Sequence, residues 1–169
     1  MIEIEIKGLE EQLEKFRRFE EIASKHLRAS MLKSVTTLRS EIVPLTPVFL
    51  GRLRNSINSE VVDDGHLSIV GKVGSSLRSE IYPLVMEFGR KPGAKMPPPS
   101  ALERWVHLQL GVSEKEALGV AFKVAWGIHR HGIKARHFMR EGYNKSKDRI
   151  IGYFNDALKR ITEEISLGN

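Results

Sequence analysis

PLTPVFLGRLRNSI, residues 44–57, separates two segments whose apolar residues recur with different periods. Before it, apolar residues recur every three or four positions from about Leu9 to Ile42, which predicts one long amphipathic helix and leaves a break near residues 20–24 open. Pro44 ends this helix, because the residue before a proline avoids helical geometry. Pro47 and Gly51 favour a bend that leads from the helix into a sheet.

The side chains of this corner divide into two sets. Leu53 and Ile57 are predicted to insert into the core at the edge of the sheet. Arg52 and Arg54 are predicted to point away from them and to stay free for a partner. The segment is therefore interpreted mainly as a structural corner, and a role as a contact surface is the second interpretation.

Four strands are predicted, at residues 2–6, 55–63, 66–74 and 80–88. The first alternates with period two, and Asp64–Gly65 predicts a hairpin turn between the second and the third. The adjacent carboxylates of Asp63 and Asp64 are better explained by this turn than by Mg²⁺ binding. Pro83 leaves an edge strand or a short helix open for the fourth.

Three helices are predicted in the second half of the chain. They cover residues 100–110, residues 113–132 and a stretch that begins near Phe138. Ser113 and Glu116 have the spacing of a capping box. The second helix has an inner face of mostly small residues: Ala117, Val120, Ala121, Val124, Ala125 and Ile128. The third carries an apolar seam that packs either within the domain or on another subunit: Ile151, Phe154, Leu158, Ile161 and Ile165.

These elements predict a single α+β domain over residues 1–169, in which a small antiparallel sheet packs against the long N-terminal helix and the C-terminal helix. This arrangement buries one apolar set together: Ile2, Ile4, Leu38, Ile57, Val70, Phe88 and Phe154. Residues 90–99, RKPGAKMPPP, form a basic loop within this domain. Its prolines cannot donate backbone hydrogen bonds, and Met96 is its only large apolar side chain, so the loop is predicted to project and to be poorly held.

Composition limits the function classes. The chain is 41% hydrophobic and 28% charged, which is typical of a globular protein, and it contains no Cys for a disulfide or a thiolate site. The formal net charge of +6 permits contact with polyanions without requiring it. The first residues lack the basic start and apolar run of a signal peptide, and no stretch approaches the roughly 18 apolar residues of a membrane span.

The sequence contains little evidence of the catalytic or cofactor-binding groups that an enzyme needs. Motifs for nucleotide binding and for a nucleophile elbow do not occur. His129, His131 and His137 could bind a metal, but Arg130, Lys134 and Arg136 surround them with positive charge. No catalytic, cofactor or metal site is therefore predicted, and a binding or assembly module is the class that remains.

Three segments taken together carry a resemblance: TPVFLGRLRNSI after the long helix, VMEFGR after the hairpin, and GIKARHFMREGY before the last helix. In this order and spacing, the chain from about Ile2 to about Ile165 resembles the tail-completion, or head–tail joining, proteins of long-tailed double-stranded DNA bacteriophages, with the lambda-type tail-completion proteins among their relatives. The matching positions are Thr46, Pro47, Gly51, Leu53, Ser56, Ile57, Glu87, Phe88, Gly89 and Phe138.

The resemblance implies a non-enzymatic structural protein of a phage or prophage virion, located at the neck or head-proximal tail end and in the bacterial cytoplasm during assembly. It implies other neck and tail proteins as partners, a homo-oligomeric ring in the particle, possible non-specific DNA contact and no membrane. The candidate protein-contact residues are Arg52, Arg54, Arg90, Lys91, Lys95, Met96, Arg136 and Phe138. The alternative is a small basic protein that binds nucleic acid without sequence preference.

Overall fold

The structure, a computed structural model, describes residues 9–48, 51–63, 68–77 and 80–167. The chain divides into two compact units, each assembled from separate stretches of sequence. Unit 1 contains Met1–Glu41, Asn58–Gly74 and Tyr143–Asn169, and unit 2 contains Ile42–Ile57 and Ser75–Gly142.

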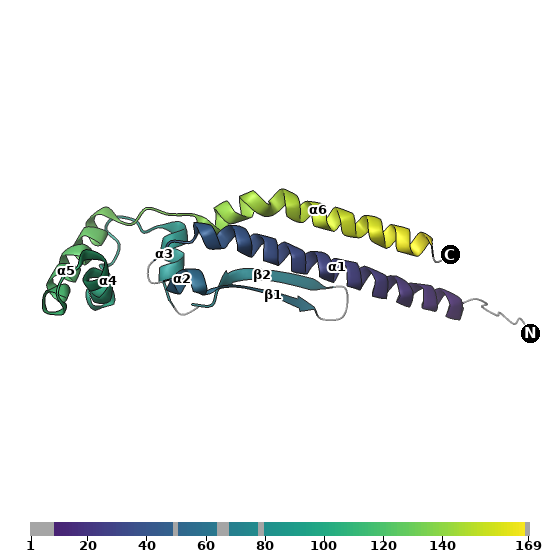
Figure 1. Ribbon diagram of the computed structural model, residues 1–169, viewed down its shortest axis with the longest axis horizontal. Coiled ribbons are helices and arrows are strands. Elements are labelled where there is room, and N and C mark those ends of the chain that lie inside the picture. Colours follow the sequence, from purple (N-terminus) through teal and green to yellow (C-terminus); the bar gives the residue numbers. More distant parts are fainter. Residues whose placement is uncertain (1–8, 49–50, 64–67, 78–79, 168–169) are drawn as a thin grey trace, which may run out of the picture. The chain divides into compact units, whose positions relative to one another are not determined.

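Six helices and two strands occur in the described ranges (Figure 1). Their bounds are α1 Leu9–Leu45, α2 Arg52–Asn55, β1 Ile57–Asp63, β2 Ile69–Ser75, α3 Tyr82–Phe88, α4 Ser100–Leu110, α5 Glu114–His131 and α6 Phe138–Ser166. β1 and β2 pair as a two-stranded antiparallel sheet. The predicted α+β class, with a small sheet and two long helices at the ends of the chain, is confirmed.

In unit 1, α1 lies between the sheet and α6 (Figure 1). Ile22, Ala23 and Ile161 form a buried cluster where α1 and α6 meet. Further along, the Ser30 hydroxyl donates to the Tyr153 carbonyl over 3.0 Å. One long helix therefore packs on both of its sides, which agrees with its dense apolar pattern.

The end of α6 is tied to α1 by polar groups. Glu164 accepts a hydrogen bond from Lys25 Nζ at 3.3 Å and lies 2.6 Å from His26 Nε2. Hydrogen bonding with His26, and then with Lys25, lowers the pKa of Glu164 below its usual value. The Glu164 carboxylate therefore stays charged further into the acid range, where it continues to hold the two helices together.

The sheet approaches α1 most closely at Gly71 of β2. A Cβ at this position would lie 2.5 Å from Met31 Sδ and 2.5 Å from Val35 Cγ1 of α1, whereas Gly74 of the same strand has open space around it. Gly71 therefore permits the contact between helix and sheet.

Gly71→Ala is expected to lower the free energy of unfolding by about 1–3 kcal/mol, because the added methyl group overpacks this contact. Gly74→Ala is the matched control, and it should raise stability by about 0.5–1 kcal/mol through the loss of backbone freedom in the unfolded chain. Urea unfolding of both variants checks the pair. Equal stabilities would show that β2 does not pack closely on α1.

Unit 2 contains a helical hairpin made of α4 and α5. Val106 of α4 and two alanines of α5, Ala117 and Ala121, form its buried centre. The predicted small-residue face of α5 is therefore confirmed at Ala117, Ala121 and Ala125, all of which are buried. Ser113 and Glu116 do interact, but the Ser113 hydroxyl donates to the Glu116 carboxylate at 2.6 Å and makes no side-chain hydrogen bond to the helix backbone.

The structure decides one open point about secondary structure and corrects one prediction. The break left open near residues 20–24 does not occur, because α1 contains no Gly or Pro before Pro44 and is continuous there. Residues 82–88 form a helix, α3, instead of a strand. Pro83 lies in the first turn of α3, where its missing N–H would have no helical partner, whereas in a strand it would remove a ladder hydrogen bond. The strand predicted at residues 2–6 lies outside the described residues.

The predicted common core is only partly correct. Ile57 is fully buried, and Leu38 and Phe154 are half-buried. Val70 is 48% exposed because it lies on the face of β2 opposite Gly71 and Val73, and side chains alternate between the faces of a strand. Phe88 is 71% exposed at the end of α3. Ile2 and Ile4 lie outside the described residues.

Candidate protein-contact site

The Glu87 carboxylate joins α3 to the first turn of α6. The side chain is buried, at 7% exposure. Its Oε2 accepts a hydrogen bond from the Met139 backbone N–H at 2.8 Å, and its Oε1 accepts one from Arg140 at 3.2 Å. The first N–H groups of a helix have no partner within the helix, and they favour a negative charge. Glu87 therefore caps α6 from a distance of about fifty residues in sequence.

Backbone hydrogen bonds extend this joint in both directions. The Glu87 carbonyl accepts from His137 N–H at 3.2 Å, and the Met86 carbonyl accepts from Arg136 N–H at 2.8 Å. Arg90 and Ile133 form an isolated antiparallel bridge with N···O distances of 2.8 and 2.9 Å. The two sequence segments EFGR and GIKARHFMREGY are thus bound to each other along their length.

Two glycines make the close approach of these segments possible. Gly89 has a φ of +75°, and a Cβ there would lie 2.6 Å from the Ile133 carbonyl oxygen. Gly132 has a φ of +72°, and a Cβ there would lie 2.2 Å from the Arg90 carbonyl oxygen. Only glycine fits both the backbone conformation and the space at these positions.

The prediction that residues 90–99 are poorly held is wrong for the first half of the loop. Besides the bridge at Arg90, Gly93 N–H donates to the His129 carbonyl at 2.7 Å. The His129 ring Nδ1 lies 2.6 Å from the Ala94 carbonyl oxygen. Gly93 thus donates to the end of α5, and Ala94 accepts from the His129 ring of the same helix. The remaining residues, 95–99, make none of the described backbone hydrogen bonds as donors.

At the corner, the predicted burial of Leu53 and Ile57 is confirmed. Leu53 and Ile57 are buried at 1% and 0% exposure, and Gly51 adopts a φ of +69°. Buried Thr46 donates its hydroxyl hydrogen bond to the Ile42 carbonyl at 2.9 Å. The Ser56 hydroxyl contacts both the Leu53 carbonyl and the Ser75 hydroxyl at 2.7 Å, which ties the corner to the end of β2.

The two arginines of the corner are not free, contrary to prediction. Arg52 forms an ion pair with Glu80. Arg54 is half-buried, with its Nη2 3.5 Å from the Thr46 carbonyl oxygen. Glu80, which follows β2 in the chain, pairs with Arg52 but not with Arg54, whose Nε is buried without a hydrogen-bond partner among the described residues.

The other predicted contact residues have different exposures. Lys91, Lys95 and Arg136 are exposed, and Arg90 and Met96 are half-buried. Phe138 is only 2% exposed, so its prediction as a contact residue is wrong. As the first residue of α6, it enters the core where Glu87 fixes the helix.

Beside the Glu87 joint, the surface opens into a mostly apolar cleft of about 400 Å³. It is lined by Ser75, Leu77, Glu80, Pro83, Leu84, Glu87, Phe88, Phe138 and Met139. Leu84 and Phe88 are 58% and 71% exposed, so large apolar side chains lie uncovered at its rim. A cleft of this kind suits an apolar side chain from another protein.

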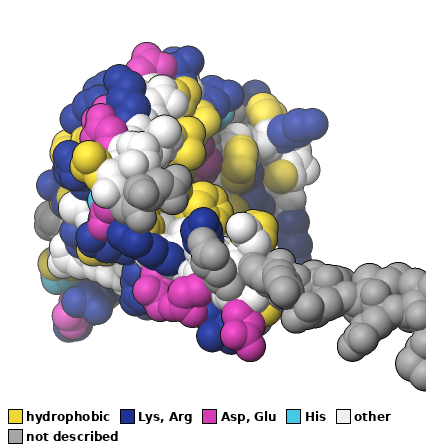
Figure 2. Space-filling view, turned by 90° about the vertical axis from the view of Figure 1, so that its right-hand side faces the viewer, with side chains coloured by type: hydrophobic (Ala, Val, Ile, Leu, Met, Phe, Trp, Pro, Cys, Tyr) yellow, Lys and Arg dark blue, Asp and Glu magenta, His cyan; other side chains and the backbone are white. Residues whose placement is uncertain are grey.

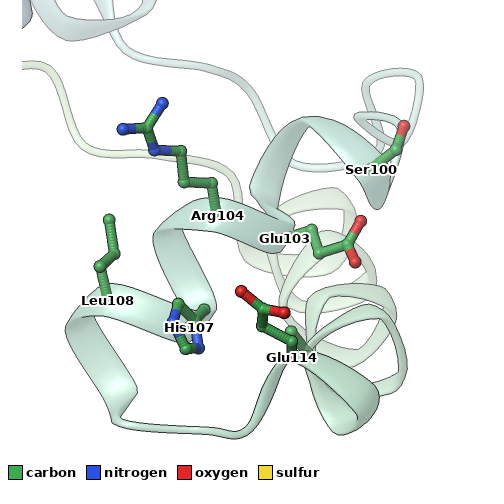
Figure 3. A pocket seen from close by; sticks show the side chains of 7 residues that line it. Ser100, Glu103, Arg104, His107, Leu108 and Glu114 are labelled. Atoms are coloured by element: carbon green, nitrogen blue, oxygen red, sulfur yellow. The ribbon is translucent and has the colours of Figure 1, made fainter.

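A second, more polar groove of about 460 Å³ lies in the α4–α5 hairpin (Figure 3). Glu114 of α5 lies beside His107 of α4, while Arg104 points away from them. His107 Nδ1 lies 2.7 Å from the Val112 carbonyl oxygen, so one ring nitrogen is already engaged. No group of three or more potential metal ligands gathers in the part of the chain that the structure describes.

Sequence reasoning missed an exposed apolar row on α5. Leu118, Phe122 and Trp126 are 51%, 54% and 50% exposed. Their four-residue spacing, next to the alanine face, was the signal that could have identified them.

Comparison of the chain with family models, with curated proteins and with solved structures finds no match. Over the described ranges, none of the helices combines the length and apolar character that a membrane crossing requires.

Proposed function

We propose that this chain is a non-enzymatic assembly protein of a phage or prophage virion, which acts at the neck or the head-proximal tail end to complete the tail and join it to the DNA-filled head. The proposal begins from the resemblance of three sequence segments to tail-completion proteins. The observation that supports it most is that two of these segments, EFGR and GIKARHFMREGY, form one joint through Glu87 and the Arg90–Ile133 bridge.

The apolar cleft next to this joint is the proposed contact surface. Phe88 belongs to the second resembling segment, yet it is exposed, whereas the neighbouring Glu87 is buried. A segment that serves only the fold would be expected to bury its aromatic residue. Exposed Phe88 and Leu84 therefore favour a role in binding another neck or tail protein, with copies of the chain arranged in a ring.

Interrupting the gene in a phage or lysogen that carries it tests the proposal. We expect DNA-filled heads and separate tails in electron micrographs of the lysate, with infectivity restored by an intact copy supplied in trans. Normal joined particles in the interrupted strain would refute the assembly role.

Phe88→Ser provides a finer test of the cleft. We expect the free energy of unfolding to change by less than about 0.5 kcal/mol, because the ring is exposed. Joined particles should fall by about tenfold or more, as expected when an aromatic anchor of an interface is lost. Val62→Ser, at a position 48% exposed on β1, is the matched control and should leave assembly unchanged. Full assembly with Phe88→Ser would exclude the cleft.

Sequence-independent nucleic-acid binding remains the second candidate on the basis of the net charge of +6. The corner arginines weaken it, since Arg52 is paired with Glu80 and Arg54 is half-buried. In addition, the end-on view of the molecule shows Lys and Arg mixed with acidic and hydrophobic side chains (Figure 2). Binding to a random DNA duplex that weakens steeply with salt would favour this candidate.

A further inference from the structure

Helix α5 has two apolar faces. One consists of Ala117, Ala121 and Ala125, which are buried. The other consists of Leu118, Phe122 and Trp126, which are each about half exposed, at 51%, 54% and 50%. Residues four apart lie above one another on a helix, so these three form a continuous row. Large uncovered side chains in a row indicate a surface that another molecule covers.

The charges of α5 indicate what covers it. The first turn carries Glu114 and Glu116 on either side of Lys115, for a net charge of −1, and the last turn carries Arg130 between His129 and His131. A second α5 laid antiparallel on the first would place each acidic end against a basic end. A parallel copy would place the ends of like net charge together. The net charges at the two ends of α5 therefore favour antiparallel pairing of two copies over parallel pairing.

We propose that α5 pairs with α5 of a second copy of this chain around a two-fold axis that passes near Phe122. In this register Phe122 meets its equivalent, and Leu118 lies opposite the second copy's Trp126, since each is four residues from the centre. Gly119, next to this row, has open space where a Cβ would lie, so it offers no obstacle to close approach. A two-fold contact uses the same patch on both copies, as this pattern requires.

The expected dimer is weak. A single helix face buries less surface than the roughly 1,200 Å² per complex at which specific, stable interfaces begin. The aromatic side chains strengthen it, and the Arg130 guanidinium, centred 5.3 Å from the Trp126 ring, adds a cation above the apolar row. We therefore expect a monomer–dimer equilibrium in the micromolar range. This pairing does not depend on the proposed role in the virion.

Analytical ultracentrifugation of the full chain over a range of concentrations tests the pairing. The unaltered chain should show a rising dimer fraction, and Phe122→Glu should remain monomeric because it brings two carboxylates together at the axis. Leu108→Glu is the matched control, at a position 48% exposed on α4, and should dimerise normally. Circular dichroism should show unchanged folding for both variants, since both positions are half exposed.

Disulfide trapping tests the direction and register. The chain contains no Cys, so each introduced Cys reports on one position alone. Phe122→Cys should cross-link to itself under mild oxidation. Leu118→Cys and Trp126→Cys should each cross-link poorly alone, because antiparallel pairing separates equivalent residues by about 12 Å along the axis. An equimolar mixture of these two variants should form the mixed disulfide.

Three results would overturn the proposal. They are a monomer at every concentration, a dimer that survives Phe122→Glu, and self-linking of Leu118→Cys and Trp126→Cys as efficient as that of Phe122→Cys. Co-sedimentation of a strictly monomeric chain with anionic lipid vesicles, abolished by Phe122→Glu, would assign the row to a membrane surface instead.

Discussion

Gly132→Ala is expected to lower the free energy of unfolding by about 4 kcal/mol, from the strained backbone conformation and the steric overlap together. The backbone at Gly132 has φ and ψ of +72° and −164°, a region that is essentially confined to glycine. The added Cβ would also lie 2.2 Å from the Arg90 carbonyl oxygen. A backbone atom cannot rotate away as a side chain can, so the bridge between Arg90 and Ile133 must open.

Substitutions at two other glycines distinguish the effect of backbone strain from that of steric overlap. Gly93 has a φ of +76° but open space around it, so Gly93→Ala should lose only about 1 kcal/mol through backbone strain. Gly152 lies within α6 and also has open space, so Gly152→Ala should gain about 0.5–1 kcal/mol. Urea unfolding of the three variants gives the comparison. A Gly132→Ala loss no larger than that of Gly93→Ala would show that the bridge does not form in solution.

Glu87→Leu is expected to lower the free energy of unfolding by about 3 kcal/mol, because it removes two charge-assisted hydrogen bonds from the start of α6. The Met139 and Arg140 N–H groups would lose the only carboxylate that reaches them from α3. Glu87→Gln should lose about 1–2 kcal/mol, since its amide oxygen can keep one neutral hydrogen bond.

Glu80→Gln is the control for the Glu87 variants, because its partner Arg52 is exposed and solvated. We expect the free energy of unfolding to change by less than about 0.5 kcal/mol in this case. Amide hydrogen exchange gives a local measurement, with faster exchange at the first turn of α6 in Glu87→Leu. If that turn remains fully protected, another group caps the helix and the role assigned to Glu87 is wrong.

The elements with a clear local pattern were predicted from sequence. α1, α4, α5 and α6 follow from apolar residues at helical spacing. The β1–β2 hairpin follows from the two strands predicted around the Asp64–Gly65 turn signal, and the burial of Leu53 and Ile57 follows from their place at the corner. These patterns can be recognised in the sequence because each depends on residues that are close together within the same element.

The candidate site was predicted less well. The sequence identified Glu87, Phe88 and Gly89 as a motif, but it placed them in a strand and placed Phe88 in the core. It treated Arg52 and Arg54 as free and Phe138 as a contact residue, whereas Glu80, Thr46 and the core respectively engage them. The errors at Arg52 and Arg54 concern side chains whose partners, Glu80 and Thr46, are more than five residues away in the chain.

The sequence by itself therefore determined the class of the fold, the positions of the long helices and the hairpin, and the need for glycine at the corner. Only the tertiary structure decided that Glu87 caps α6, that Gly89 and Gly132 allow the backbone bridge, and that α5 exposes a second apolar face. The physical reason is that periodicity records which side of an element is apolar, whereas the partner of a buried carboxylate or of a backbone N–H depends on which distant segments the folded chain brings within 3 Å or so.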